Sequence, residues 1–262
     1  MNVYLLIDAN NICHRSYYVL GSLSYDGKPT GVIFGFMRSL LALQRRFPGA
    51  KPVFCWDSGR SKRKEIDPRY KANRTKSLNG ESDTLFSQMN EIRAFLPQLG
   101  YRNNFWQEGY EADDVIASLA GDLKGKFVFI ISSDSDLLQL LRPKHAIWNV
   151  HSRKMTTECH FKQNWYGLSP MMWPDIKAMA GCKTDNIPGI PGIGPKTALT
   201  ILKEFGSVEE IYKKLTPGHK LAPKLLTFKD QALLSKKLAL IIKNAPIEAD
   251  LNNLIYTPPS KE

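Results

Sequence analysis

Three short apolar runs that each end in an aspartate constrain the fold of this chain more than any other feature. They are VYLLID, PVFCWD and KFVFIISSD, at residues 3–8, 52–57 and 126–134. Their β-branched and aromatic residues follow one another without polar alternation, which is typical of strands buried on both faces of a sheet. Apolar residues with helical spacing occur at residues 30–47, 83–100 and 111–123. This alternation predicts an α/β fold with a mostly parallel central sheet wrapped by helices.

The pattern changes after about residue 165, where only helical segments follow one another. We therefore expect an α/β domain over residues 1–165, which includes a basic segment at 58–82, and a helical subdomain over residues 166–250. The last residues, 251–262, contain TPPSKE and are expected to form a frayed tail.

Carboxylates stand where the expected strands end. Asp8 and Asp57 end the first two strands, and Asp134 and Asp136 end the third. Ligands of open parallel sheets bind at the carboxyl ends of the strands, because the loops diverge there and leave a crevice. We therefore expect these four side chains, from three distant segments, to meet at one edge of the sheet.

Three more acids, Glu111, Asp113 and Asp114, open the third helix. Acids at a helix start also cap it and complement its dipole, so Asp113 and Asp114 alone have an ordinary structural explanation. Seven converging carboxylates are different, because they would repel one another and raise each other's pKa values unless cations lay between them.

Oxygen ligands without interleaved histidine or cysteine favour Mg²⁺ or Mn²⁺ over zinc. Two such ions about 3.5–4 Å apart form the usual clamp for phosphodiester cleavage, in which one activates water and the other stabilises the leaving oxygen. The formal net charge of +11 favours a polyanionic partner, most commonly nucleic acid. The acid cluster and the basic chain together predict a nuclease.

The densest basic segment follows Asp57 directly. Residues 60–76, RSKRKEIDPRYKANRTK, carry eight Lys or Arg against two acids. Such a run has two explanations, a solvated loop or a segment that grips phosphates, and its place beside the acid cluster favours the second. Tyr70 within it could stack on a base, a contact worth about 1–3 kcal/mol in single-strand binding.

A glycine-rich stretch, IPGIPGIGPKTA, separates two helices of the second half. It places Gly189, Gly192 and Gly194 in a turn, with Pro195 at the first helical position and Lys196 behind it. An ordinary helical hairpin would explain the spacing. The glycines also let the backbone approach a partner, and a helix N-terminus suits a phosphate oxygen, so with Lys196 we expect sequence-independent DNA binding.

These motifs resemble the 5′-nuclease family, which contains the 5′-to-3′ exonuclease domain of bacterial DNA polymerase I and the stand-alone flap endonucleases of phages. The matching segments are LIDANN, WD, YKANR, EADDVIASLA, SSDSDLLQL and DNIPGIPGIGPKTA, and TGVIFGFMRSL is similar to the family's first long helix. The resemblance runs from about residue 3 to about residue 245. It implies a PIN-like nuclease core, a helix-hairpin-helix subdomain, and a free-standing nuclease without polymerase or proofreading parts.

The resemblance also implies roles for individual residues. The first metal site would be made by Asp8, Asp57, Glu111, Asp113 and Asp114, and the second by Asp134, Asp136 and Asp185. Arg15 would approach the scissile phosphate, and Lys71 would act from the arch formed by the basic segment. Tyr70 and Arg74 would guide a single-stranded 5′ end. The turn from Gly189 to Lys196 would hold duplex DNA and, as in relatives, a K⁺ ion through backbone carbonyls.

One position departs from the family pattern. The family usually has G-D-x-x-D-N where this chain has Gly181 to Asn186, so Cys182 replaces an acidic ligand of the second ion. A free thiol is soft, mostly protonated near neutral pH, and a poor ligand for Mg²⁺. Lys183 adds positive charge next to it. The second ion is therefore expected to bind more weakly, and Mn²⁺ to serve better than Mg²⁺.

These residues predict a structure-specific 5′-to-3′ exonuclease and flap endonuclease with two-metal catalysis. Its expected partners are DNA with 5′ flaps or free 5′ ends and primer RNA annealed to DNA. Two alternatives stay open. A PIN-type ribonuclease would be expected to lack the helical part after residue 165, and a structure-specific DNA-binding protein could have lost catalysis through Cys182.

The cellular setting is expected to be the cytoplasm of a bacterium or a phage-infected cell. The four cysteines contain no C-x-x-C pair, which argues against a zinc site or a disulfide framework. The longest early apolar run, residues 3–7, is too short for a signal peptide or a membrane span. No membrane partner is expected, and the family implies a monomer.

Overall fold

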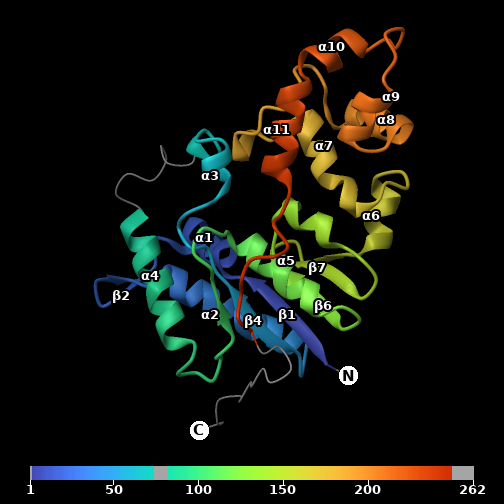
Figure 1. The fold of residues 1–262 in the computed structure, drawn as a ribbon. Coiled ribbons are helices and arrows are strands. Elements are labelled where there is room, and N and C mark those ends of the chain that lie inside the picture. The colour runs from blue at the N-terminus through green and yellow to red at the C-terminus, as the bar shows by residue number, and fades with distance from the viewer. Residues whose placement is uncertain (1, 74–81, 250–262) are drawn as a thin grey trace.

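The computed structural model describes residues 2–73 and 82–249. Its main feature is a six-stranded sheet in the order β5-β4-β1-β6-β7-β8 (Figure 1). Neighbouring strands are parallel, except that the last one runs antiparallel to its neighbour. The strands are β1 (Val3–Asp8), β4 (Lys51–Cys55), β5 (Asn104–Phe105), β6 (Phe127–Ile131), β7 (His145–Asn149) and β8 (Lys154–Thr156). The predicted mostly parallel sheet is confirmed.

The two faces of the central strand pack against different helices. Leu5 and Ile7 face one way, into a core shared with α1, α2 and α4, whereas Tyr4 and Leu6 face the core beneath α5. This alternation follows from the two-residue period of a strand, and burial on both faces explains why β1 carries no polar residue before Asp8. The helices are α1 (Ala9–Leu20), α2 (Gly31–Arg46), α4 (Ser82–Phe95) and α5 (Ala112–Asp122).

Within the described residues the chain after β8 forms helices, the first of which begins at Glu158, before the boundary expected near residue 165; that boundary stays a prediction. These helices are α6 (Glu158–Asn164), η3 (Pro170–Met172), α7 (Trp173–Ala180), η4 (Lys183–Asp185), α8 (Pro195–Phe205), α9 (Val208–Lys214), α10 (Ala222–Thr227) and α11 (Lys229–Ala239). Helix α11 packs along α7 (Figure 1). One continuous apolar core joins this helical part to the sheet, because Leu6 and Val115 belong to the same buried cluster as Ile201 and Leu225.

The smaller elements complete the chain. They are β2 (Ser24–Tyr25), β3 (Lys28–Pro29), α3 (Arg63–Ile66) and η2 (Ser135–Leu140). The second expected strand ends at Cys55 rather than Asp57, so Asp57 stands two residues beyond it in the loop. The expected frayed tail at 251–262 lies outside the described residues. Among the described residues, no helix is both long enough and apolar enough to cross a membrane.

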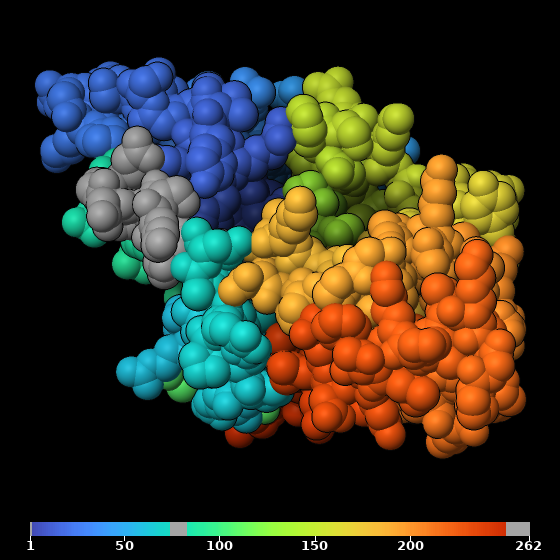
Figure 2. Space-filling model, turned by 90° about the horizontal axis from the view of Figure 1, so that it is seen from above, coloured from blue at the N-terminus to red at the C-terminus, as the bar shows by residue number. Residues whose placement is uncertain are grey.

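The basic segment after β4 lies against the helical part. Figure 2 shows the cyan region that contains α3 in contact with the orange and red C-terminal helices. Three of the hydrogen bonds in this contact end on backbone carbonyls: Asn186 Nδ2 donates to Arg69 O (2.7 Å), Asn73 Nδ2 to Lys183 O (2.8 Å), and the Lys71 amide to Asp185 O (3.0 Å). Residues 69–73, which we call the base of the basic segment, are therefore hydrogen-bonded to the loop between α7 and α8.

Candidate active site

An acidic cleft of about 500 Å³ opens at the carboxyl ends of β1, β4 and β6. Its walls come from α1, the loop after β4, the start of α5, the loop after β6 and the base of the basic segment. The lining carboxylates are Asp8, Asp57, Glu111, Asp113 and Asp134. Five of the eight predicted metal ligands thus lie around one cleft, where the parallel strands end.

Asp8 lies at the floor of this cleft. It ends β1 and caps α1, because its Oδ1 accepts a hydrogen bond from the Asn11 amide (2.9 Å). Its Oδ2 accepts one from Ser132 Oγ (2.7 Å). Burial raises the pKa of Asp8 to about 7 and outweighs the two hydrogen bonds, which lower it; the charges of Asp57 and Asp134 raise it further by a smaller amount. A carboxylate in this position is stabilised by a nearby cation.

Asp113 stands in the first turn of α5 and faces the same space. Burial raises its pKa well above the ordinary value, and the charges of Asp134 and Asp8 raise it further. Asp57 secures the helix start, because its Oδ1 accepts the Ala112 amide (2.7 Å). Its own amide donates to Asn10 Oδ1 (3.0 Å), which ties the loop after β4 to α1.

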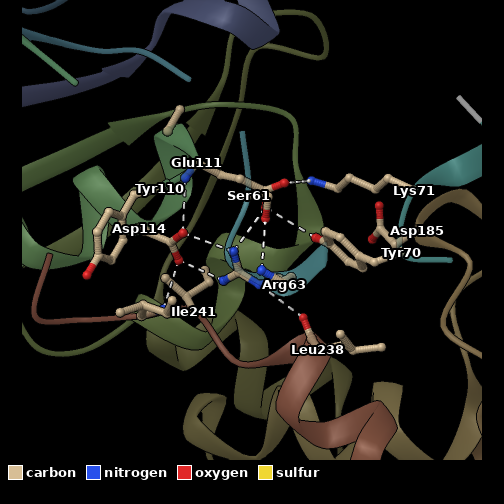
Figure 3. Close-up of polar contacts among 12 residues, drawn as sticks. Ser61, Arg63, Tyr70, Lys71, Tyr110, Glu111, Asp114, Asp185, Leu238 and Ile241 are labelled. Carbon is tan, nitrogen blue, oxygen red and sulfur yellow. Dashed lines mark hydrogen bonds and ion pairs between the residues drawn. The ribbon is translucent and has the colours of Figure 1, made fainter. Parts of the chain in front are cut away.

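Glu111 joins the cleft to the base of the basic segment (Figure 3). Its Oε1 accepts from Lys71 Nζ (2.8 Å), and its Oε2 accepts from Arg63 Nη1 (3.0 Å) and Tyr70 Oη (3.2 Å). Lys71 therefore lies in the wall of the cleft as the ion-pair partner of Glu111.

Asp114 departs from its predicted role as a metal ligand. It is 1% exposed, and both oxygens accept from the Arg63 guanidinium, at 2.9 and 2.7 Å (Figure 3). The amides of Glu111 and Ile242 also donate to this carboxylate. Because one residue of helix turns a side chain by about 100°, Asp113 faces the cleft and Asp114 faces the interior. Asp114 is a buried partner of Arg63, a residue that the sequence did not single out.

Tyr70 also departs from its prediction. We expected its ring to stack on a base, but it is 3% exposed and packs beside Ile187 and Leu238. Burial of the phenol raises its pKa above the ordinary range. The ring packs between the basic segment and α11, because removing its apolar surface from water is favourable. Arg74, its expected companion, lies outside the described residues.

The residues predicted for the second ion meet a lysine. Asp136 and Asp185 are buried, and Lys177 Nζ forms an ion pair with Asp136 Oδ1 and lies 3.9 Å from Asp185 Oδ2. Cys182 is beside them, with its Sγ 3.3 Å from Asp185 Oδ2 as donor and 3.9 Å from Lys177 Nζ. Asp134 is turned to the acidic cleft. Lys177 was not among the residues predicted from the sequence. A lysine among the mostly buried residues of α7 was the only signal that could have indicated a buried ion pair here.

Arg15 lies on α1 but not in the wall of the cleft. Its Nη2 is 2.5 Å from His151 Nδ1, in the turn between β7 and β8. The cleft is lined instead by Asn11, His14 and Tyr18. These three stand at spacings of three and four residues, which places them on one helix face. Counting onward from Asp8 in steps of three and four residues would have identified these positions in the sequence.

The glycine turn between α7 and α8 divides into a buried and an exposed part. Gly189 is buried, with its amide donating to Ser235 Oγ (3.2 Å) and its carbonyl accepting from Gln231. A Cβ on Gly189 would lie 2.2 Å from the Gly181 nitrogen, so glycine is needed for contact within the protein rather than with DNA. Gly192, Gly194 and Lys196 are exposed and available to a partner.

The carboxylates of the cleft supply oxygen donors only, which suit Mg²⁺ or Mn²⁺. Within residues 2–73 and 82–249, no three Asp, Glu, His or Cys side chains converge as a ready ligand set. The carboxylate oxygens of Asp8, Glu111 and Asp57 instead accept hydrogen bonds from Ser132, from Lys71 and from a backbone amide, respectively. The chemistry of the donors fits a divalent ion, and binding it would exchange some of these hydrogen bonds.

Comparison with known proteins gives matches over nearly the whole chain. Residues 3–166 match the model of the 5′-3′ exonuclease N-terminal resolvase-like domain, and residues 168–262 that of the 5′-3′ exonuclease C-terminal SAM fold. DNA polymerase I of Bacillus subtilis (strain 168) is 36% identical, over 98% of this chain. Thermostable DNA polymerase I of Thermus thermophilus is 33% identical, over 94%. The chain spans 30% of the length of each of these relatives.

Solved structures share the fold. The T5 D15 protein, co-crystallized with metal ions, aligns with a TM-score of 0.77 at 22% identity, over 93% of this chain and 90% of that one. The catalytic core of Rad2 in complex with DNA substrate aligns with a TM-score of 0.61 at 18% identity, over 98% and 84%. The arrangement of a parallel sheet with a helical C-terminal part is therefore common to these proteins and to this chain.

Proposed function

The chain belongs to the 5′-3′ exonuclease family, as its motifs predicted, and we propose that it hydrolyses DNA phosphodiesters near a junction of single strand and duplex that bears a free 5′ end. The observation that carries this proposal is the acidic cleft at the carboxyl ends of three parallel strands. Burial and mutual repulsion raise the pKa values of Asp8 and Asp113 there. Carboxylates held at such a cost are typical of a functional site that takes a cation.

The proposed ligands of a divalent ion are Asp8, Asp57, Glu111, Asp113 and Asp134, all in the wall of the cleft. When bound, such an ion would activate water and stabilise charge on the phosphate. Ser132 orients Asp8 through its hydroxyl, and the Ala112 amide orients Asp57. Mg²⁺ and Mn²⁺ both suit these oxygen donors.

Cationic side chains around the cleft would bind the substrate. Lys71 is at the cleft wall, paired with Glu111, and we assign it to the scissile phosphate. Arg15, which lies beside His151, would contact the DNA strand next to the scissile phosphate. Lys196 with the exposed Gly192 and Gly194 would hold the duplex by its backbone, and K⁺ is the ion proposed for that turn.

A labelled 5′-flap substrate with Mg²⁺ or Mn²⁺ tests the function. We expect Asp8→Asn and Asp113→Asn each to lower the cleavage rate by about 100-fold, because each would remove a negative ligand without changing the volume of the side chain. Asp122→Asn is the matched control, since Asp122 is an exposed acid at the other end of α5. Equal rates for Asp113→Asn and Asp122→Asn would refute the assigned site.

Primer RNA annealed to DNA is a proposed second substrate, supported by the family resemblance. The same assay with a 5′ ribonucleotide segment tests this, and cleavage of the RNA strand that Asp8→Asn abolishes is the expected result. Cleavage of DNA alone would limit the proposal to deoxyribonucleotides.

A second candidate function is structure-specific DNA binding with weak or lost catalysis. Cys182 favours it, because the thiol stands where the family has a carboxylate. The two candidates differ in one result: wild-type protein that binds the flap tightly but cleaves it no faster than Asp8→Asn with either metal would be a binding protein.

A further inference from the structure

The buried group around Lys177 carries an inference about how many ions this chain takes. Lys177 extends from the middle of α7 to Asp136 at the start of η2 and to Asp185 at the end of η4. The ammonium forms an ion pair with Asp136 and lies 3.9 Å from Asp185 Oδ2. All three residues are less than a tenth exposed. The lysine therefore stands in the space between the carboxylates that the resemblance assigns to a second ion.

Burial makes this arrangement demanding. An ammonium removed from water is unfavourable unless carboxylates or other acceptors compensate it, and the same holds for each buried carboxylate. Lys177 supplies one positive charge to the two negative charges of Asp136 and Asp185. The Cys182 thiol adds a hydrogen bond to Asp185 Oδ2 at 3.3 Å, without a negative charge of its own.

A divalent ion does not fit this group as it stands. The double positive charge of a divalent ion beside the Lys177 ammonium would repel that ammonium, because a buried site screens charges weakly. The exchange of a carboxylate for Cys182 removes the negative charge that could have offset this repulsion. Asp134 does not restore it, because it lines the acidic cleft and raises the pKa values of Asp8 and Asp113 there.

We propose that the Lys177 ammonium takes the place of a second divalent ion, so that this chain binds a single divalent ion, at the carboxylates of the acidic cleft. The inference rests on the proposed function only for the identity of that cleft as the ion's site. Lys177 is then a positioning residue. It holds Asp185, whose carbonyl accepts the Lys71 amide (3.0 Å), and so fixes the base of the basic segment beside the cleft.

Counting bound Mn²⁺ on metal-free protein tests the proposal without any cleavage measurement. Equilibrium dialysis, at free Mn²⁺ well above the dissociation constant of the first site, is expected to give one ion per wild-type chain. The double variant Lys177→Met/Cys182→Asp removes the ammonium and restores the carboxylate, and is expected to bind two. Lys177→Arg keeps the positive charge and is expected to stay at one.

Any wild-type count other than one overturns the proposal, whether or not the double variant folds. A count of one for a double variant that is folded by circular dichroism also overturns it, since Lys177 would then not be what excludes the second ion. Lys162→Met on α6, where the lysine pairs with Glu158 on the surface, controls for loss of a lysine elsewhere. A chain that binds one ion but does not cleave DNA would refute the proposed function and leave this inference standing.

Discussion

Replacement of Arg63 by methionine tests how the buried ion pair holds the basic segment to the rest of the protein. Arg63 is 3% exposed, and its guanidinium donates to both oxygens of Asp114, to Glu111, and to the carbonyls of Leu238 and Leu240 (Figure 3). Burial works against the charged form of Arg63, but the hydrogen bond and charge of Asp114 outweigh it and raise its pKa. Arg63→Met keeps much of the side-chain volume and removes the charge and all five hydrogen bonds.

The expected cost follows from what the substitution leaves behind. Asp114, at 1% exposure, would remain as a buried carboxylate without its cation, and two buried or partly buried carbonyls would lose their donors. Removal of one partner of a buried ion pair costs about 3–5 kcal/mol. Two amides still donate to Asp114, from Glu111 and Ile242, so we expect the lower half of that range, about 3–4 kcal/mol.

Urea unfolding followed by far-ultraviolet circular dichroism, without divalent ions, measures this cost. Arg60→Met is the matched control, because Arg60 also pairs with an acid, Glu108, but both side chains are exposed (84% and 71%), so its loss should leave the stability nearly unchanged. In the double variant Arg63→Met/Asp114→Asn the buried negative charge is gone, so its cost should be at least about 2 kcal/mol below the sum of the two single costs. Equal costs for Arg63→Met and Arg60→Met, or additive costs in the double variant, would refute the reasoning.

Three further predictions concern backbone geometry and pH. Gly189→Ala should destabilise the chain by about 2 kcal/mol or more, because its Cβ would lie 2.2 Å from the Gly181 nitrogen and its φ is +62°; Gly194→Ala, with no atom within 4 Å, should unfold in urea as the wild type does. Burial lowers the pKa of His145 to about 4, so the unfolded chain binds the proton first, and stability should fall by about 3 kcal/mol as pH drops from 6.5 to 4. His145→Gln should remove that part of the pH dependence, and unchanged slopes would count against it. The pKa of Asp8 is raised to about 7, so the folded metal-free protein keeps this proton where the unfolded chain has lost it, and stability should decrease as pH rises from about 4 to about 7 and then level off. Asp8→Asn should therefore stabilise the protein more at pH 8 than at pH 4, in unfolding measured at both values.

The fold could be predicted from sequence because its signals are local. Uninterrupted apolar runs at residues 3–8 and 126–134 predicted strands, and helical periods predicted α2 and α5 to within one residue of their observed bounds. Helix α4 was also predicted but ends at Phe95, five residues earlier than expected. Strands β7 and β8 were missed, because the segment from His145 to Thr156 mixes polar and apolar residues without a clear period. Antiparallel β8 pairs at the edge of the sheet, where solvent exposure allows such a mixture.

The candidate site was less accessible to the same reasoning. The convergence of Asp8, Asp57 and Asp134 follows from parallel strands that end at one edge. Which of two neighbouring acids enters the cleft does not follow, because helix phase sends Asp113 to the cleft and Asp114 to Arg63. Residues 63 and 114 are 51 positions apart, and no local pattern pairs them.

The sequence by itself determined the class of fold, the edge of the sheet where the acids gather, the excess of positive charge, and the substitution of Cys182 for an acid. Each depends on composition or on a period of a few residues. The tertiary structure alone decided which partner each buried charge takes: Arg63 with Asp114, Lys177 with Asp136, and Tyr70 with the interior instead of a base. The reason is that a buried charge is compensated by whatever packing brings within hydrogen-bonding distance, and packing joins segments whose separation along the chain carries no information about their contact.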